Sequence, residues 1–338
     1  MLSERTLRPV WYGDVQPSWF LRMLAGVYCS LAALRRGLYQ SGLLRAVRLP
    51  VPVVVIGNIS VGGTGKTPLA IALIDGLRAR GLVPGVISRG YGGHAPGPVV
   101  VDAQGDPTTV GDEPVLIARS TGAPVAVGRD RVAASRLLLA AAKVDVLIAD
   151  DGLQHYSLAR DVEICVIDGE RRFGNRRRLP AGPLREPLAR LAMVDFRVCN
   201  GGIPGPDEIA MTLDGDIAVA LLDHSVSRPL REFRGSRVHA VAAIGNPARF
   251  FAQLRAAGLE PIEHPFPDHH PFHASDLEFG DELPVMMTAK DAVKCRLFAD
   301  ARQWCVPVRA QLPAEFFDAV AAKVVQCTAA REVRGTSD

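Results

Sequence analysis

The 338-residue chain has six cysteines but no Cys-x-x-Cys pair, and they are scattered from Cys29 to Cys327. Several of them lie in apolar runs, where cysteine behaves as a small hydrophobic residue. This arrangement argues against a disulfide framework or a zinc site and predicts a protein of the reducing cytoplasm. The sequence also lacks internal repeats and low-complexity tracts, and no signal peptide is visible.

Acidic residues are absent between Val15 and Ile74, although this interval contains five arginines: Arg22, Arg35, Arg36, Arg45 and Arg48. The formal net charge of +3 is too small to indicate a nucleic-acid partner. The one-sided block of charge instead predicts contact with an anionic surface.

An apolar stretch at residues 19–34 lies inside this basic block. It is shorter than the roughly 20 residues of a membrane span, and Arg22 interrupts it. Ser18 is placed to cap a helix there. Two interpretations remain open: a core helix packed on the domain, or a helix lying in the cytoplasmic face of a membrane. The second is favoured because Trp19, Phe20 and Tyr28 join the acid-free segment, so we expect residues 1–48 to associate with membranes.

Short strands alternate with helices after this region. A β-branched run at residues 51–56 leads into a Gly-rich loop and a helix at 67–80. Further strands are expected at 84–88, 124–127, 144–149, 162–167 and 196–199. This alternation predicts an α/β fold with a doubly wound, mostly parallel sheet.

The alternating pattern weakens between residues 201 and 229, where Gly, Pro and Asp cluster around one apolar run. It resumes with a strand at 238–244, a helix at 248–257, a strand at 285–288 and a helix at 313–328. We therefore expect a core domain over residues 49–225 and a smaller α/β lobe over residues 226–338.

The segment GNISVGGTGKT, at residues 57–67, is the most informative part of the sequence. After a strand, such a Gly-rich turn and helix N-terminus form a cradle of backbone N–H groups for phosphates. Lys66 would reach the β- and γ-phosphates, and the Thr67 hydroxyl would bind Mg²⁺. Ser60 replaces the first glycine of the general pattern GxxxxGK[ST], which we treat as a variant. The residues expected to bind ATP are Ser60, Val61, Gly62, Gly63, Thr64, Gly65, Lys66 and Thr67.

Two carboxylates, Asp150 and Asp151, end an apolar strand further along the chain. In P-loop enzymes such a strand lies beside the one that leads into the phosphate loop, so its terminal acid meets the Mg²⁺. We predict that Asp150 and Asp151 bind the metal together with Thr67. The alternative is an ordinary Asp-Gly turn, but Gln154 and His155 follow directly and favour a site.

Two further polar clusters, Gly-Asp112-Glu113-Pro and Phe-Pro-Asp268-His269-His270, lie far apart in the sequence. Each alone is typical of a loop. A hydroxyl acceptor would need a positioned base, however, and a carboxylate–imidazole pair can serve as one. Arg185, in the rigid segment GPLREP, is suited to stabilise phosphoryl charge in a transition state.

Taken in order, these motifs resemble one family, the tetraacyldisaccharide 4'-kinases that phosphorylate lipid A precursors. The matching segments, spread over about residues 50–295, are GNISVGGTGKTP, SRGYGG, GDEP, ADDGLQH, LPAGPLREP, GNPARFF, FPDHHPF and the variant TAKDAVK. The resemblance implies a two-lobed P-loop kinase at the cytoplasmic face of the inner membrane. Such an enzyme uses ATP and Mg²⁺ to phosphorylate the 4'-hydroxyl of a tetraacylated glucosamine disaccharide 1-phosphate. No obligate protein partner is implied.

The resemblance also implies roles for single residues. Asp112 would be the general base with His269 as its partner, although His270 stays an alternative. Arg185 would face the transferring phosphoryl group, as Lys66 would. Residues implied to surround these groups or the substrate are Tyr91, Gln154, His155 and Asp268. Ala289 stands where the family has glutamate, which leaves the role of the TAKDAVK segment open.

Two other functions compete with this interpretation. One is a P-loop ATPase or GTPase that moves a partner without transferring phosphate to a lipid. A GTPase normally reads guanine through an NKxD element, which the sequence lacks. The other is a non-catalytic nucleotide-binding regulator, which would not need a distant base.

Overall fold

The structure is a computed structural model that describes residues 4–335, so the predicted domain limits at residues 1 and 338 lie outside the described residues. Its larger sheet has the strand order β15-β8-β7-β6-β1-β5-β2-β4-β3. These strands are β1 (Val53–Gly57), β2 (Pro84–Ser88), β3 (Val99–Val100), β4 (Val125–Val127), β5 (Val146–Ala149), β6 (Val162–Asp168), β7 (Phe196–Asn200), β8 (Glu208–Asp214) and β15 (Arg309–Gln311). Neighbours are parallel except β3–β4 and β8–β15. The predicted α/β fold with a mostly parallel sheet is confirmed.

Both faces of this sheet are covered, which explains why β1 is apolar throughout. Val54 and Ile56 face one hydrophobic cluster, and Val53 and Val55 face another. The first cluster contains side chains of α3 (Lys66–Arg78), α5 (Asp112–Thr121) and α9 (Ala314–Gly335). The second contains side chains of α6 (Arg131–Ala141).

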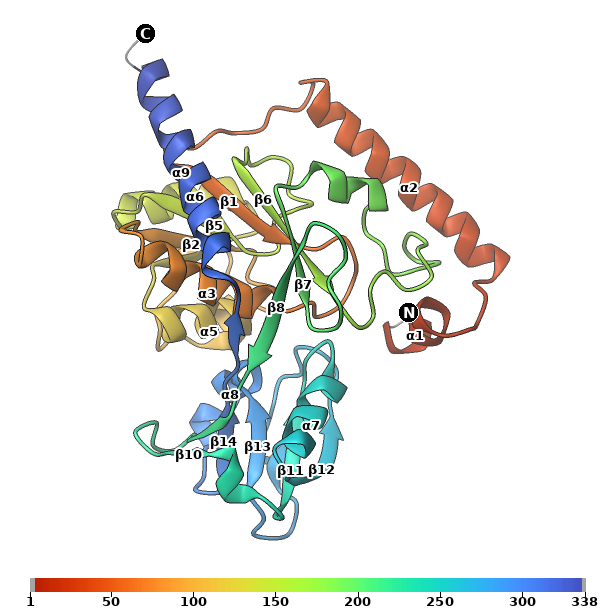
Figure 1. Ribbon diagram of the computed structural model, residues 1–338, viewed down its shortest axis with the longest axis vertical. Coiled ribbons are helices and arrows are strands. Elements are labelled where there is room, and N and C mark those ends of the chain that lie inside the picture. The colour runs from red at the N-terminus through yellow and green to blue at the C-terminus, as the bar shows by residue number, and fades with distance from the viewer. Residues whose placement is uncertain (1–3, 336–338) are drawn as a thin grey trace.

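A second lobe is built on a smaller sheet with the order β10-β9-β14-β13-β11-β12. Its strands are β9 (Ile217–Ala220), β10 (Ser227–Pro229), β11 (Arg237–Ala242), β12 (Glu260–Pro265), β13 (Val285–Thr288) and β14 (Gln303–Val306). The helix α7 (Pro247–Ala256) contributes Phe250 and Phe251 to one of its cores, and α8 (Ala289–Cys295) contributes Ala292 and Cys295 to another. Figure 1 shows this lobe below the larger sheet, with β8 running between the two.

The remaining elements are short, apart from α2. They are α1 (Glu4–Tyr12), α2 (Trp19–Gln40), α4 (Pro107–Val110) and the 3₁₀ segments Leu188–Met193, Leu230–Phe233, Ala274–Leu277 and Arg296–Phe298.

The domain limits differ from the predicted 49–225 and 226–338 at both ends of the second lobe. The strand β9, which precedes the predicted limit at residue 226, already belongs to the smaller sheet, and after β14 the chain returns to the first lobe. There β15 pairs with β8, and α9 buries Phe316, Val320 and Val324 in the core that α3 also lines. The second lobe therefore spans residues 217–306, and the C-terminal helix belongs to the first.

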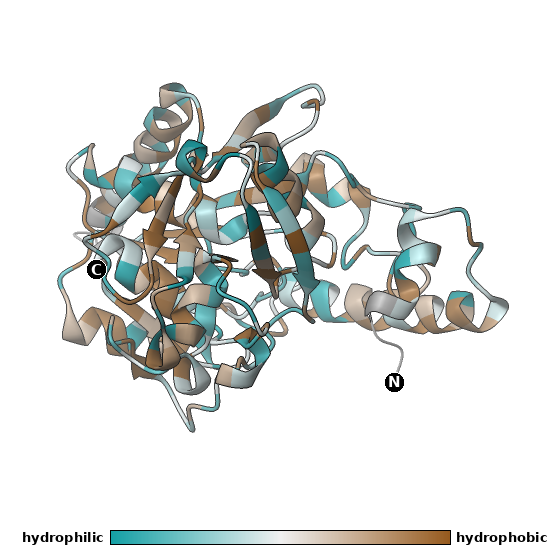
Figure 2. Ribbon diagram, turned by 90° about the horizontal axis from the view of Figure 1, so that it is seen from below, coloured by the Kyte–Doolittle hydropathy of each residue, from teal (hydrophilic) through white to brown (hydrophobic). Residues whose placement is uncertain are grey.

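The helix α2 stands away from both sheets (Figure 1). Ser18 caps it as predicted, accepting a hydrogen bond from the backbone N–H of Leu21, and the helix continues to Gln40. Only Leu21 and Ala25 are buried along it. Its exposed apolar side chains are Trp19, Phe20, Met23, Val27, Leu31 and Leu34. Figure 2 shows brown bands recurring along this helix. The alternative of a core helix does not fit this exposure.

Among the described residues, no helix has the length and apolarity that crossing a membrane requires.

Candidate active site

The P-loop connects β1 to α3 and is held in place by the end of β7. Gly65 caps α3 with φ of +94°, a left-handed conformation that favours glycine, and a Cβ there would collide with the side chain of Asn200. The Asn200 amide donates to the Thr64 carbonyl at 2.9 Å. Ser60 does not have positive φ, and its backbone pairs with that of Leu184. The serine therefore replaces the usual glycine without backbone strain.

Asp151 follows β5 and faces the P-loop lysine. Lys66 Nζ lies 3.4 Å from its Oδ1, and Arg185 Nη1 lies 3.3 Å from each of its carboxylate oxygens. Burial would raise the pKa of Asp151, but Lys66 and Arg185 outweigh it and hold that pKa far below the ordinary value. Three of the predicted residues thus meet at the carboxyl edge of the large sheet.

Asp150, one residue earlier, has a different environment. It is completely buried, and neither of its carboxylate oxygens has a hydrogen-bond partner among the described residues. Burial and the nearby charges of Glu113 and Asp151 raise its pKa to about 7. A buried carboxylate without a partner is costly unless it is protonated or meets a cation.

The oxygens of Asp150, Asp151 and Thr67 are suitable ligands for Mg²⁺. This ion prefers a few carboxylate or hydroxyl ligands, completed by phosphate oxygens and water. Asp150 supplies the orphaned oxygens, and Thr67 lies in the first turn of α3. No cluster of three or more His, Cys, Asp or Glu side chains within residues 4–335 could hold a metal by itself. A cation here would therefore depend on nucleotide oxygens for part of its coordination.

Gln154 and His155 follow these acids in the sequence, and within the described chain no hydrogen bond joins either side chain to Asp150 or Asp151. Gln154 Nε2 donates to the Asn58 carbonyl at 3.0 Å and to Glu186 at 2.7 Å. His155 Nε2 contacts the Ser157 hydroxyl at 2.9 Å. Gln154 thus supports the strand that leads into the P-loop.

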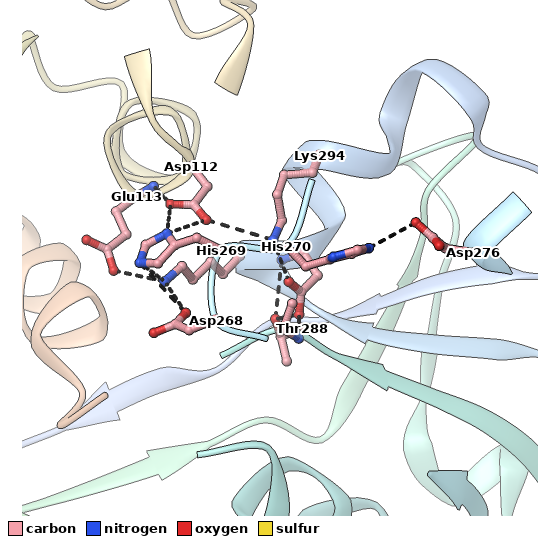
Figure 3. Close-up of polar contacts among 11 residues, drawn as sticks. Asp112, Glu113, Asp268, His269, His270, Asp276, Thr288 and Lys294 are labelled. Carbon is pink, nitrogen blue, oxygen red and sulfur yellow. Dashed lines mark hydrogen bonds and ion pairs between the residues drawn. The ribbon is translucent and has the colours of Figure 1, made fainter. Parts of the chain in front are cut away.

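The base candidates come from different lobes and meet in space. Asp112 is the first residue of α5, preceded by Gly111 with φ of +94°. His269 follows β12 in the second lobe, and its Nδ1 lies 3.0 and 3.1 Å from the two Asp112 oxygens. His270 instead contacts Asp276 at 3.0 Å (Figure 3). His269 is therefore the imidazole that meets Asp112.

Two lysines of α8 complete this cluster, and sequence reasoning gave neither a role. Lys290 Nζ lies 3.1 Å from Glu113, 3.0 Å from Asp268 and 3.2 Å from His269 Nε2. Lys294 Nζ lies 3.8 Å from an Asp112 oxygen. The available signal was that two of only five lysines in the chain are spaced four apart in TAKDAVK. Thr288 caps this helix, so Ala289 leaves it intact.

The electrostatics of the pair follow from these contacts. Burial raises the pKa of Asp112, but the hydrogen bond with His269 and the charge of Lys290 outweigh it and lower that pKa overall. Burial lowers the pKa of His269, yet the bond to Asp112 raises it overall. When His269 is neutral, Lys290 donates to Nε2, so Nδ1–H donates to Asp112. Asp112 is then an ionised acceptor held in a fixed orientation.

A cavity of about 190 Å³ adjoins this pair. The ring of Tyr91 lies against that of His269, with centroids 4.6 Å apart, and lines the cavity with Thr109 and several glycines. Arg89 and Arg129 also line it, and neither forms an ion pair with a carboxylate in the described chain. Both are exposed.

Two further contacts were not predicted. Arg131, buried at the start of α6, donates to the Asp151 carbonyl at 2.9 Å. Tyr28 of α2 donates to the Arg185 carbonyl at 3.1 Å. The exposed N-terminal helix therefore touches the loop that carries a candidate active-site arginine.

The sequence matches a known protein family. Residues 17–325 match the family model of tetraacyldisaccharide-1-P 4'-kinases. The chain belongs to this family. Among curated members, it is 53% identical to the tetraacyldisaccharide 4'-kinase of Nitrosococcus oceani over 90% of each chain. It is 55% identical to that of Aromatoleum aromaticum over 86% of this chain and 89% of the relative.

A solved structure of the family is also similar. It is the "apo" form of LpxK from Aquifex aeolicus in complex with ATP, with a TM-score of 0.72 and 27% sequence identity. The match covers 90% of this chain and 96% of the Aquifex chain.

Proposed function

We propose that this protein is an ATP-dependent kinase that phosphorylates the 4'-hydroxyl of a tetraacyldisaccharide 1-phosphate in lipid A biosynthesis. The observation that carries the proposal is the Asp112–His269 contact, which supplies a base at the same sheet edge as the P-loop. Glu113, beside the base, is close enough to Asp150 to raise its pKa. A P-loop protein that only bound or hydrolysed nucleotide would not need this second centre.

In the proposed reaction, each of the candidate side chains has a defined role. The acceptor oxygen attacks the γ-phosphorus of ATP, the bond from that phosphorus to the bridging oxygen breaks, and ADP leaves. Asp112 accepts the hydroxyl proton, with His269 fixing its orientation. Lys66 and Arg185 stabilise the charge on the phosphoryl oxygens, and both are released from Asp151 as they turn to the nucleotide.

Magnesium would be held by Asp150, Asp151 and Thr67. When bound, it would neutralise phosphate charge and orient the γ-phosphate for transfer. Its presence would also remove the cost of the unpaired Asp150 oxygens.

The cavity beside the base is proposed to receive the sugar and the 1-phosphate of the acceptor before transfer. Tyr91 offers a ring against which a sugar can pack, and Arg89 and Arg129 offer positive charge without competing carboxylates. A disaccharide monophosphate has both a sugar ring to pack on Tyr91 and a phosphate to meet the arginines.

Association with the cytoplasmic face of the inner membrane is proposed to depend on α2. Its exposed apolar stripe would enter the lipid, and the arginines of residues 18–48 would meet anionic headgroups. Because the substrate carries several acyl chains, a tethered enzyme can meet it at the bilayer surface.

Flotation with anionic liposomes tests this role. Binding should weaken as salt rises, since charge is screened, but persist through the apolar stripe. Replacing Phe20, Val27 and Leu31 by serine should abolish flotation, whereas serine at the exposed Ala33 and Gly37 should not. A stripe variant that floats like the wild type would remove α2 from the proposal.

The catalytic proposal is tested by measuring ATP consumption with and without an acylated glucosamine disaccharide 1-phosphate. A kinase consumes ATP in proportion to the phosphorylated lipid formed. Acceptor-independent consumption would indicate an ATPase, and binding of ATP without consumption would indicate a regulator. Either result would contradict the proposal.

A further inference from the structure

Arg171 lies between the P-loop and the second lobe. Its Nη2 donates to the carbonyl of Gly63 at 2.8 Å, and its Nη1 donates to the carbonyl of Gly245 at 3.3 Å. Gly245 belongs to the turn between β11 and α7. One guanidinium therefore joins the phosphate loop of one lobe to a turn of the other.

The guanidinium is held in place by Asp168, the last residue of β6. This carboxylate is 2% exposed and accepts from Arg171 Nε and from the Arg171 backbone N–H, both at 2.9 Å. From the second lobe, Arg249 Nη2 lies 3.4 Å from the same carboxylate and 3.6 Å from Glu170, and it is buried without a hydrogen bond to any described residue. Asp168 thus faces an arginine from each lobe.

The two turns also touch directly. A Cβ on Gly245 would collide with the backbone nitrogen of Gly63, so only glycine fits at this approach. The Gly63 N–H is one of the groups expected to cradle phosphate. If nucleotide binding shifts the backbone at Gly63, the turn at Gly245, which packs directly against it, should shift as well.

The same turn is tied to the base. His269 donates its backbone N–H to the carbonyl of Ala243, two residues before Gly245, at 3.3 Å. The strands β11 and β12, which lead into these two segments, are parallel neighbours in register from Arg237 to Ala242. Gly245 and His269 therefore follow two paired strands at the same edge of the smaller sheet.

We propose that Arg171 is a positioning residue that couples the P-loop to the second lobe, so that nucleotide binding stabilises the docking of His269 against Asp112. The inference rests on the proposed function, because it assumes a nucleotide in the P-loop. It assigns Arg171 no contact with the reacting atoms. Its effect reaches the base through Gly245, Ala243 and His269.

The neighbouring Arg172 offers a matched control. It is also ion-paired, with both its terminal nitrogens 2.7 Å from Glu208, but it contacts neither Gly63 nor Gly245. Arg171→Ala and Arg172→Ala each remove an ion-paired arginine from this segment. Only Arg171→Ala also removes the hydrogen bonds to Gly63 and Gly245.

Hydrogen exchange of the full-length chain, with and without Mg²⁺ and a non-hydrolysable ATP analogue, tests the coupling without any lipid. In the wild type, the analogue should slow exchange in the P-loop and also in residues 243–250. In Arg171→Ala it should still protect the P-loop but no longer protect residues 243–250. Arg172→Ala should behave like the wild type. If Arg171→Ala does not fold, Arg171→Lys, which keeps the charge but not the fork of donors, carries the same test.

Kinetics provide the second readout. Arg171→Ala should lower kcat roughly tenfold, and it should have little further effect in a His269→Ala background, because the coupling ends at that imidazole. Residues 243–250 that respond to the analogue equally in wild type and Arg171→Ala would overturn the inference, as would a wild type in which they do not respond. If the analogue fails to protect even the wild-type P-loop, the proposed function itself is wrong.

Discussion

The nucleotide half and the base half of the candidate site are built in different ways. The nucleotide half lies wholly in the first lobe, in segments that follow strands or loops at one sheet edge. It consists of Lys66, Asp150, Asp151 and Arg185. Of the base half, only Asp112 and Glu113 belong to that lobe. His269, Lys290 and Lys294 come from the second. All candidate nucleotide-binding residues therefore come from one lobe, whereas the Asp112–His269 contact forms only when the two lobes are docked.

The contacts that dock the lobes at the base are polar. Lys290 bridges Glu113 and His269, and Asp112 faces His269 and Lys294. Polar contacts between lobes are cheaper to open than apolar ones, because water replaces the lost partners. We therefore expect substitutions in the nucleotide half to affect chemistry directly. Substitutions in the base half should affect both chemistry and the docking of the lobes.

Lys66→Ala is expected to have the largest effect, namely loss of measurable turnover in a folded protein. In the proposed mechanism the Lys66 ammonium faces the phosphates and has no replacement, and among the described residues Asp151 would keep only Arg185 as an ion-pair partner. Steady-state kinase assays and circular dichroism measure the two outcomes. Lys143→Ala, at an exposed lysine, is the control. Normal phosphate transfer by Lys66→Ala would remove the P-loop from the mechanism.

The base comes next. Asp112→Asn and His269→Ala should each slow turnover by about 10²–10⁴. The double variant should be little slower than either single one, because the two side chains act as a unit. His270→Ala removes the adjacent imidazole, which contacts Asp276 instead, and should leave turnover near normal. A double variant whose loss equals the product of the single losses would mean that the pair acts independently.

Sequence alone predicts that the residues of the nucleotide half lie together, because its signals are local. The strand, the glycine turn and the Lys66–Thr67 pair are contiguous, and parallel strands bring their carboxyl ends to one edge. Asp150 could therefore be assigned to that edge from its position after a strand.

The base half and the lobe boundary needed the structure. Nothing local shows that α9 returns to the first lobe, since its buried Phe316 and Val320 would suit either core. The contact between Asp112 and His269 was expected only from family resemblance, and Lys290 was missed because its partners lie up to 177 positions away. Arg131 was missed because an arginine at a helix start usually faces water.

Lys290→Met tests whether the base depends on docking of the lobes, and its effect should be smaller. It leaves Glu113 and Asp268 without their shared cation and His269 Nε2 without its donor, so turnover should fall roughly tenfold. Because Lys290 lowers the pKa of Asp112, its loss should raise that pKa. Asp112 acts when ionised, so the acid limb of the pH profile of kcat/KM should move to higher pH.

Lys323→Met serves as the control for this variant. Lys323, on α9 of the first lobe, also forms an ion pair, with Asp195 at 2.7 Å, although it is more exposed than Lys290. It should change neither turnover nor the acid limb. An unshifted limb in Lys290→Met, with turnover reduced, would show that the lysine acts only on structure.

The smallest effect is expected on stability, and it returns to the nucleotide half. Burial and the charges of Arg131 and Arg160 lower the pKa of His155 to about 4. In an unfolded chain that pKa would be about 6.5. As pH falls, the unfolded chain therefore binds the proton first. The contribution of His155 to the free energy of unfolding is complete above about pH 6.5 and is lost progressively between pH 6.5 and 4.

Urea unfolding of wild type and His155→Gln at pH 7.5 and pH 5 measures this contribution. His155 is only partly buried, so solvent screening reduces the difference to about 1 kcal/mol. The variant should lose less stability on acidification than the wild type, while His224→Gln, at an exposed histidine of the second lobe, should lose as much as the wild type. Some acid sensitivity should remain in His155→Gln, because burial and His239 also lower the pKa of His264 in the second lobe. Parallel losses in wild type and His155→Gln would mean that protonation of His155 is not the source of the acid sensitivity.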